Sequence, residues 1–114
     1  MSLCPYCSVS SDDAWASSEH AIAVPPVEPF CQGHVVVAPR RHVPRFYDLD
    51  VEEQNYVWKL VSEVQRHVMA ALAVGAVAVG FADSSDDQGH ALIHIVPRYG
   101  PAMNLPGGIE WIAQ

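Results

Sequence analysis

The chain has 114 residues, of which 50% are hydrophobic and 17% are charged. This length and composition predict a single folded domain over residues 1–114. The net charge of −7 argues against unaided binding to DNA or RNA. The longest apolar run, near residues 70–79, is broken by Gly75, so no membrane span or membrane partner is expected. The first twenty residues lack the apolar h-region of a signal peptide, and we expect a cytoplasmic protein.

Two apolar segments in the first forty residues are predicted to be strands. They cover residues 19–24 and residues 33–38, and the second has a run of β-branched valines that ends at Pro39. Three prolines between them impose an extended loop, because proline fixes φ and has no N–H. Residues 1–18 are predicted to be irregular.

Residues 51–74 are the one segment with clear helical periodicity. Asp50 can serve as the N-cap, with Glu53 three residues later in the capping-box arrangement. The predicted apolar stripe consists of Val57, Leu60, Val61, Val64, Val68 and Leu72. Gly75 is the predicted terminator of this helix.

The last third of the chain is predicted to contain two more strands, at residues 76–81 and 90–96, joined by a polar loop at 84–88. A tail rich in Pro and Gly follows from residue 100. Strands, one long helix and strands again favour an antiparallel α+β domain over an alternating βαβ fold. Trp15 and Trp58 are expected to be packing residues.

The second of these strands carries the most specific pattern in the chain. Its sequence is Gly89-His90-Ala91-Leu92-Ile93-His94-Ile95-Val96-Pro97-Arg98. On a strand, residues 90, 92 and 94 would point to one face. The segment resembles the signature of the histidine triad (HIT) family of nucleotide hydrolases and transferases, in which three histidines alternate with apolar residues. Leu92 stands where that family has its middle histidine.

Other segments extend this resemblance over nearly the whole chain, in family order. They are the Cys4-Pro5-Tyr6-Cys7 start, residues 33–42, residues 48–53, the exit Pro97-Arg98-Tyr99 and the tail at 107–111, which resembles bacterial relatives of diadenosine-polyphosphate hydrolases. The resemblance implies a HIT-like fold with an antiparallel sheet of about five strands, one long helix at about 51–74 and at most one short helix. It also implies a homodimer formed through the long helix and an adjacent strand.

Cys4 and Cys7 have the spacing with which two thiolates grip one tetrahedral ion. The resemblance to zinc-bearing relatives supplies His42 and His90 as the other two ligands, which implies a structural Zn²⁺. Cys-Pro-Tyr-Cys is also the active-site tetrapeptide of glutaredoxins. Thiol–disulfide exchange would need a full strand before the first cysteine and a helix after it. Residues 8–11 form a poor helix, which argues against this redox function. Cys31 is expected to be an ordinary buried thiol.

The resemblance also implies that the reactive group of the family is missing. Its middle histidine attacks phosphorus, whereas Leu92 has no lone pair. His94 lies two residues away, which is about 7 Å along a strand, and it is the candidate that remains for catalysis or phosphate binding. Glu28 is the nearest substitute for the family's ribose-binding acid, where Pro26 now stands. Gln88 is a substitute phosphate donor in a loop with three acidic residues.

Two main hypotheses therefore remain, and the sequence leaves open whether the chain is an enzyme. The first is a degenerate, zinc-stabilised HIT domain that binds a nucleotide or another small molecule, or acts as a regulatory module. The second is an active hydrolase of nucleoside phosphoramidates or dinucleoside polyphosphates that uses His94 or another group. An unrelated activity with a remodelled metal centre at His34 or His94 is a third.

Overall fold

A computed structural model describes residues 4, 6–7, 9–10 and 12–98 of the chain. Five strands and one long helix make up the described part, which confirms the α+β class. The strands are β1 (Ala16–Ser17), β2 (Ala21–Val24), β3 (Val35–Pro39), β4 (Val77–Ala82) and β5 (Leu92–Pro97). The helix is α1 (Val51–Leu72), and a single 3₁₀ turn at Phe46–Asp48 precedes it.

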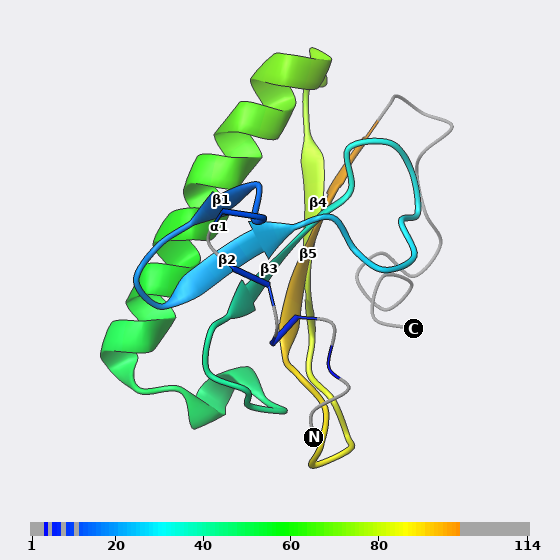
Figure 1. The fold of residues 1–114 in the computed structure, drawn as a ribbon. Helices are drawn as coiled ribbons and strands as arrows, with labels where there is room; N and C mark the ends of the chain where they lie inside the picture. Colours follow the sequence, from blue (N-terminus) through cyan, green and yellow to red (C-terminus); the bar gives the residue numbers. More distant parts are fainter. Residues whose placement is uncertain (1–3, 5, 8, 11, 99–114) are drawn as a thin grey trace.

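The strands form one antiparallel sheet in the order β1-β2-β3-β5-β4 (Figure 1). The triad-like strand β5 therefore lies inside the sheet, between β3 and β4. His94 of β5 is paired with Val36 on one side and with Gly80 on the other. β4 is an edge strand of the sheet.

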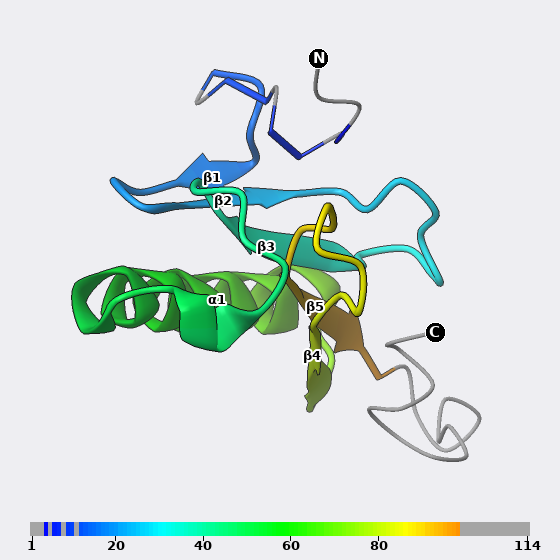
Figure 2. The same cartoon turned by 90° about the horizontal axis from the view of Figure 1, so that it is seen from below.

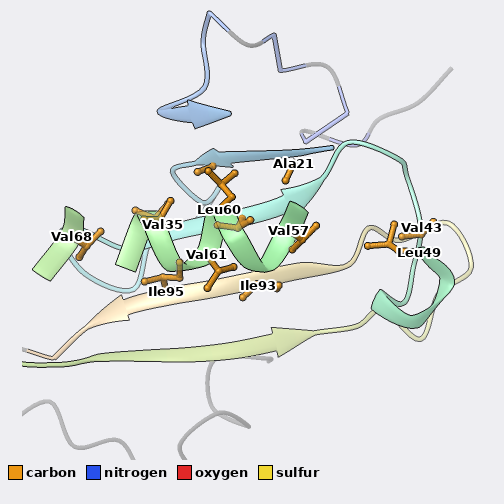
Figure 3. Close-up of a cluster of buried hydrophobic side chains, with 13 residues drawn as sticks. Ala21, Val35, Val43, Leu49, Val57, Leu60, Val61, Val68, Ile93 and Ile95 are labelled. Atoms are coloured by element: carbon orange, nitrogen blue, oxygen red, sulfur yellow. The ribbon is translucent and has the colours of Figure 1, made fainter. Parts of the chain in front are cut away.

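Helix α1 covers one face of the sheet (Figure 2). The capping box predicted at its start is present, since Asp50 accepts a hydrogen bond from the Glu53 amide and Glu53 accepts one from the Asp50 amide. Valines and leucines of α1 pack against Val35, Ile93 and Ile95 of the sheet (Figure 3). Alternation along a strand places these sheet residues on the face beneath α1.

The opposite face of the sheet carries a second, smaller apolar cluster. Ile22, Val24 and Ala38 are buried there, and Tyr6, Val9, Ala14 and Leu92 pack against them. Figure 2 shows the N-terminal segment on the side of the sheet away from α1. The two sheet faces are thus covered by different parts of the chain, one by α1 and the other by Tyr6, Val9 and Ala14 of the N-terminal segment.

Several predicted details differ from the structure. Helix α1 ends two residues early, because Ala73, and not Gly75, takes the left-handed C-cap conformation with φ 53°. The strand β1 falls in a segment predicted to be irregular. Trp15 and Trp58, expected to be packing residues, are 46% and 42% exposed, and they pack at the surface against His67 and against Phe46 and Phe81. His90 precedes β5 instead of lying on it.

The predictions for residues 99–114 lie outside the described residues. Within the described part of the chain, no helix is both long and apolar enough to cross a membrane.

Candidate functional site

Cys4, Cys7, His42 and His90 converge at the end of β3, and their ligand atoms all lie within 4.8 Å of one another. His90 Nδ1 lies 3.3 Å from Cys4 Sγ and 3.5 Å from Cys7 Sγ, and His42 Nδ1 lies 2.8 Å from Cys7 Sγ. The spacing of the cysteines and the family resemblance together predicted this set of four residues, and the structure brings all of them together. They could hold one metal ion.

Backbone hydrogen bonds account for this convergence. A turn closed by the Cys7 amide on the Cys4 carbonyl brings the two thiols side by side. The Ala91 amide donates to the Val43 carbonyl at 2.7 Å, which aligns His90 with His42. Gly89 is required next to this pairing, because a Cβ there would overlap the side chain of Ser84.

Both imidazoles are oriented for metal binding through Nδ1. His90 Nε2 donates to the Pro39 carbonyl and His42 Nε2 donates to the Gln88 carbonyl, each at 2.8 Å. A carbonyl only accepts, so Nε2 of each ring carries a proton, and Nδ1 is the nitrogen that faces the thiols. Burial lowers the pKa of His90 and His42 lowers it further, against the opposing bond to Pro39. Two thiolates and two neutral imidazoles in this arrangement suit tetrahedral Zn²⁺.

A second pair of histidines lies on the sheet face opposite α1. His34 Nε2 and His94 Nδ1 are 2.9 Å apart, and the Phe30 amide donates to His34 Nδ1 at 3.0 Å. Burial and the neighbouring His94 lower the pKa of His34 to about 4, and burial lowers the pKa of His94. Both rings are therefore neutral at pH 7. The sequence pointed to each histidine separately but not to their contact, which joins residues 60 positions apart.

Leu92 lies on the same face as His94 and is half-buried. Its side chain packs with the cluster that Tyr6, Val9 and Ala14 of the N-terminal segment complete. Position 92 is thus occupied by an apolar side chain that packs against the same buried cluster as the N-terminal segment.

Glu28 and Gln88, the predicted nucleotide contacts, are not gathered around His94 by any described hydrogen bond. Glu28 is exposed in the β2–β3 loop. Gln88 is exposed as well, and its backbone carbonyl supports His42.

The acidic residues of the β4–β5 loop have structural partners. Asp83 accepts from the Phe46 amide, Asp86 accepts from the Gln88 amide and Asp87 pairs with Arg45. These bonds fix the loop that leads into His90.

Comparison with known proteins identifies the family. The HIT domain model matches residues 9–100. The chain is 33% identical over 75 residues to the asymmetrical bis(5'-nucleosyl)-tetraphosphatase of Schizosaccharomyces pombe, over 63% of this chain and 41% of that protein. It is 30% identical over 94 residues to the bis(5'-adenosyl)-triphosphatase of Dictyostelium discoideum, over 79% of this chain and 62% of that protein. The chain therefore spans less than two thirds of the length of either relative.

A solved structure carries the same fold. The zinc-bound histidine triad family protein of Mycobacterium smegmatis superposes with a TM-score of 0.75 at 20% identity, over 90% of this chain and 81% of that one. At this identity the likeness concerns the fold. Together with the match of the family model over most of the chain, it establishes that this chain belongs to the HIT domain family and is related to dinucleoside polyphosphate hydrolases.

Proposed function

We propose that this chain is a zinc-stabilised HIT domain that binds a nucleotide or a related small molecule without cleaving it. The observation that carries the proposal is Leu92. The family resemblance places the nucleophilic imidazole at this position, and an alkyl side chain cannot attack phosphorus. Leu92 also packs, half-buried, against the cluster of Ile22, Val24 and Ala38, so it forms part of the apolar packing on this face.

The remaining histidines support binding more readily than attack on phosphorus. Both ring nitrogens of His90 are already engaged, since Nδ1 contacts the Cys4 thiol and Nε2 donates to the Pro39 carbonyl. For His94, the chain of hydrogen bonds assigns a tautomer. The Phe30 amide occupies His34 Nδ1, so His34 donates from Nε2 to His94 Nδ1, and the proton of His94 is on Nε2. A neutral N–H donor in that position suits a phosphate or carbonyl oxygen of a ligand.

The metal in this proposal is a structural Zn²⁺ held by Cys4, Cys7, His42 and His90. Protein groups would fill all four ligand positions of a tetrahedral ion, as in closed structural sites. The zinc would join the N-terminal segment to β3 and to the loop before β5. Thiolate ligands need a reducing compartment, which supports the expected cytoplasmic location.

The alternative is a hydrolase that uses His94. The burial of His94 as a neutral imidazole on the same sheet face as position 92 favours it, and attack by Nε2 would require that nitrogen to lose its proton first. Relatives named as polyphosphate hydrolases favour it as well. The two functions differ in one measurable property, which is turnover.

The test compares the natural chain with Leu92→His on an adenosine phosphoramidate and on diadenosine tetraphosphate. We expect saturable nucleotide binding without turnover in the natural chain, and turnover at least a hundredfold above background in Leu92→His, because the substitution restores an imidazole. Leu92→Asn is the matched control, since it is also polar at position 92 but has no nucleophile. Thermal melting of both variants checks that the apolar cluster tolerates them.

Turnover by the natural chain that His94→Ala abolishes would contradict the proposal and identify His94 as the catalyst. Equal turnover in Leu92→His and Leu92→Asn would also contradict it, because the imidazole would then not be the missing group.

A further inference from the structure

A cavity of about 380 Å³ lies where β2 ends and β3 begins. The β2–β3 loop, which projects from the end of the sheet in Figure 1, forms much of its wall. Trp15 and Val35 also line it, and Val35 belongs to the core beneath α1. The Cys4, Cys7, His42 and His90 side chains lie at the other end of β3, beside the Pro39 carbonyl. The cavity is therefore separate from the metal centre, and it adjoins the histidine pair only through His34.

The walls of the cavity are mostly apolar and carry no formal charge, although the polar residue Gln32 is among the lining residues. Pro25 and Pro29 contribute rigid rings, and no lining side chain is an acid, a lysine or an arginine. Cys31 is a neutral thiol at pH 7, because burial raises its pKa. His34 offers the cavity only its ring surface, since Phe30 and His94 engage both of its nitrogens. A phosphate would find no cation here, so the chemistry of the walls selects an uncharged ligand.

Trp15 is the aromatic residue in the lining of the cavity. Its backbone is fixed by a hydrogen bond from its amide to the Ala23 carbonyl at 2.8 Å. Its ring meets the His67 ring of α1 edge-on, with centroids 4.7 Å apart and planes at 76°. The indole is nevertheless 46% exposed, so a large apolar surface next to an apolar cavity faces solvent. Aromatic rings gain free energy by stacking on such a surface.

We propose that this cavity binds an uncharged planar aromatic molecule, of one or two fused rings, that stacks on Trp15. The volume lies in the range of small-molecule sites, which is roughly 300–1,000 Å³. The two prolines fix the wall in advance, so little conformational entropy is lost on binding. This site is additional to the nucleotide site proposed above and does not depend on it.

The test is a titration of the zinc-loaded, ¹⁵N-labelled chain with indole, followed by amide chemical shifts. We expect saturable shifts at Cys31, Gln32 and Gly33. Trp15→Ala should weaken indole binding at least tenfold, and Trp15→Phe should weaken it less because a ring remains. Trp58→Ala is the matched control, since Trp58 is as exposed as Trp15 but lies outside the cavity, and it should change the affinity less than twofold.

Three results would overturn the proposal: shifts that do not saturate, shifts that centre on Leu92 and His94, or equal weakening by Trp15→Ala and Trp58→Ala. A parallel titration with AMP separates the two sites. If AMP shifts the His94 amide and still does so in Trp15→Ala, the nucleotide proposal stands regardless of the result of the indole titration.

Discussion

His90 and His94 are four positions apart in one motif, yet their partners give them different chemistry. His90 Nε2 is bonded to a backbone carbonyl, which turns Nδ1 toward two thiols. His94 Nδ1 is bonded to another imidazole, which leaves the proton on Nε2. The partner of one ring nitrogen decides what the other nitrogen can do. The role of each histidine therefore follows from its contacts more than from its place in the motif.

The His34–His94 contact predicts a dependence of stability on pH. The pKa of His34 is lowered from 6.5 to about 4, because burial and His94 disfavour a charge. The unfolded chain therefore binds more protons than the folded one between these values. The contribution of His34 to the free energy of unfolding is therefore fully present above about pH 6.5 and is lost as the pH falls toward 4. We expect the free energy of unfolding of the natural chain to fall by about 1–3 kcal/mol more than that of His34→Asn over this range.

Urea denaturation at several pH values measures this difference. His67→Asn is the control, because His67 is an exposed histidine on α1. Its pH dependence should match that of the natural chain. A natural chain and a His34→Asn variant with parallel pH profiles would show that His34 is not held neutral by folding.

Residues whose role rests on short spacing or on the family pattern were predictable. The Cys4–Cys7 pair is visible in the sequence, and the resemblance added His42 and His90. The contact of His34 with His94 and the place of Trp15 at a cavity were not predictable. Both depend on which strands become neighbours, and the sequence within a few residues of either position does not indicate this strand pairing.

Elements were predicted best where local signals agree. The start of α1 has a capping box and a periodic stripe, and it was predicted to the residue. Its end was misplaced because a glycine suggested a C-cap, whereas Ala73 takes the left-handed conformation. The two-residue β1 has no pattern of its own and exists only through pairing with β2.

An exposed aromatic patch joins α1 to the edge strand β4. Trp58 of α1 meets Phe46 and Phe81, with centroids 5.9 Å and 5.2 Å away, and Trp58 and Phe81 are 42% and 40% exposed. The family resemblance implies dimerisation through the long helix and an adjacent strand, and aromatic residues are enriched at interfaces. We therefore expect a homodimer, and Trp58→Glu should convert it to a monomer by placing a charge in a patch that the dimer would bury.

Sedimentation equilibrium measures this conversion. Trp15→Glu is the matched control, because Trp15 is equally exposed but lies outside the patch, and it should leave the dimer intact. A natural chain that sediments as a monomer at tens of micromolar would contradict the prediction.

At the scale of the whole molecule, the four residues proposed as zinc ligands come from three separated parts of the chain. They are the Cys4–Cys7 turn, His42 just after β3 and His90 just before β5. The Cys4–Cys7 turn lies at the start of the segment that covers the outer face of the sheet through Tyr6, Val9 and Ala14. The core beneath α1, in contrast, includes no residue of that segment before Ala16. Metal binding should therefore stabilise the N-terminal segment on the outer face of the sheet, while the core between the sheet and α1 should persist without the metal.

Removal of the metal tests this division. A high-affinity zinc chelator should lower the Tm by about 10 °C, because binding at a hundredfold excess over Kd stabilises by about 2.7 kcal/mol and each kcal/mol shifts Tm by roughly 4 °C or more. Far-UV circular dichroism should change little, since α1 and its core remain, while amide exchange should accelerate at residues 12–14 and in β2. The Tm of Cys7→Ser should equal that of the natural chain in the presence of the chelator, and adding the chelator to this variant should not change its Tm. Cys31→Ser should respond as the natural chain does, because Cys31 is not among the clustered ligands. Loss of helical signal together with the metal would mean that the zinc holds the whole fold and not only its outer layer.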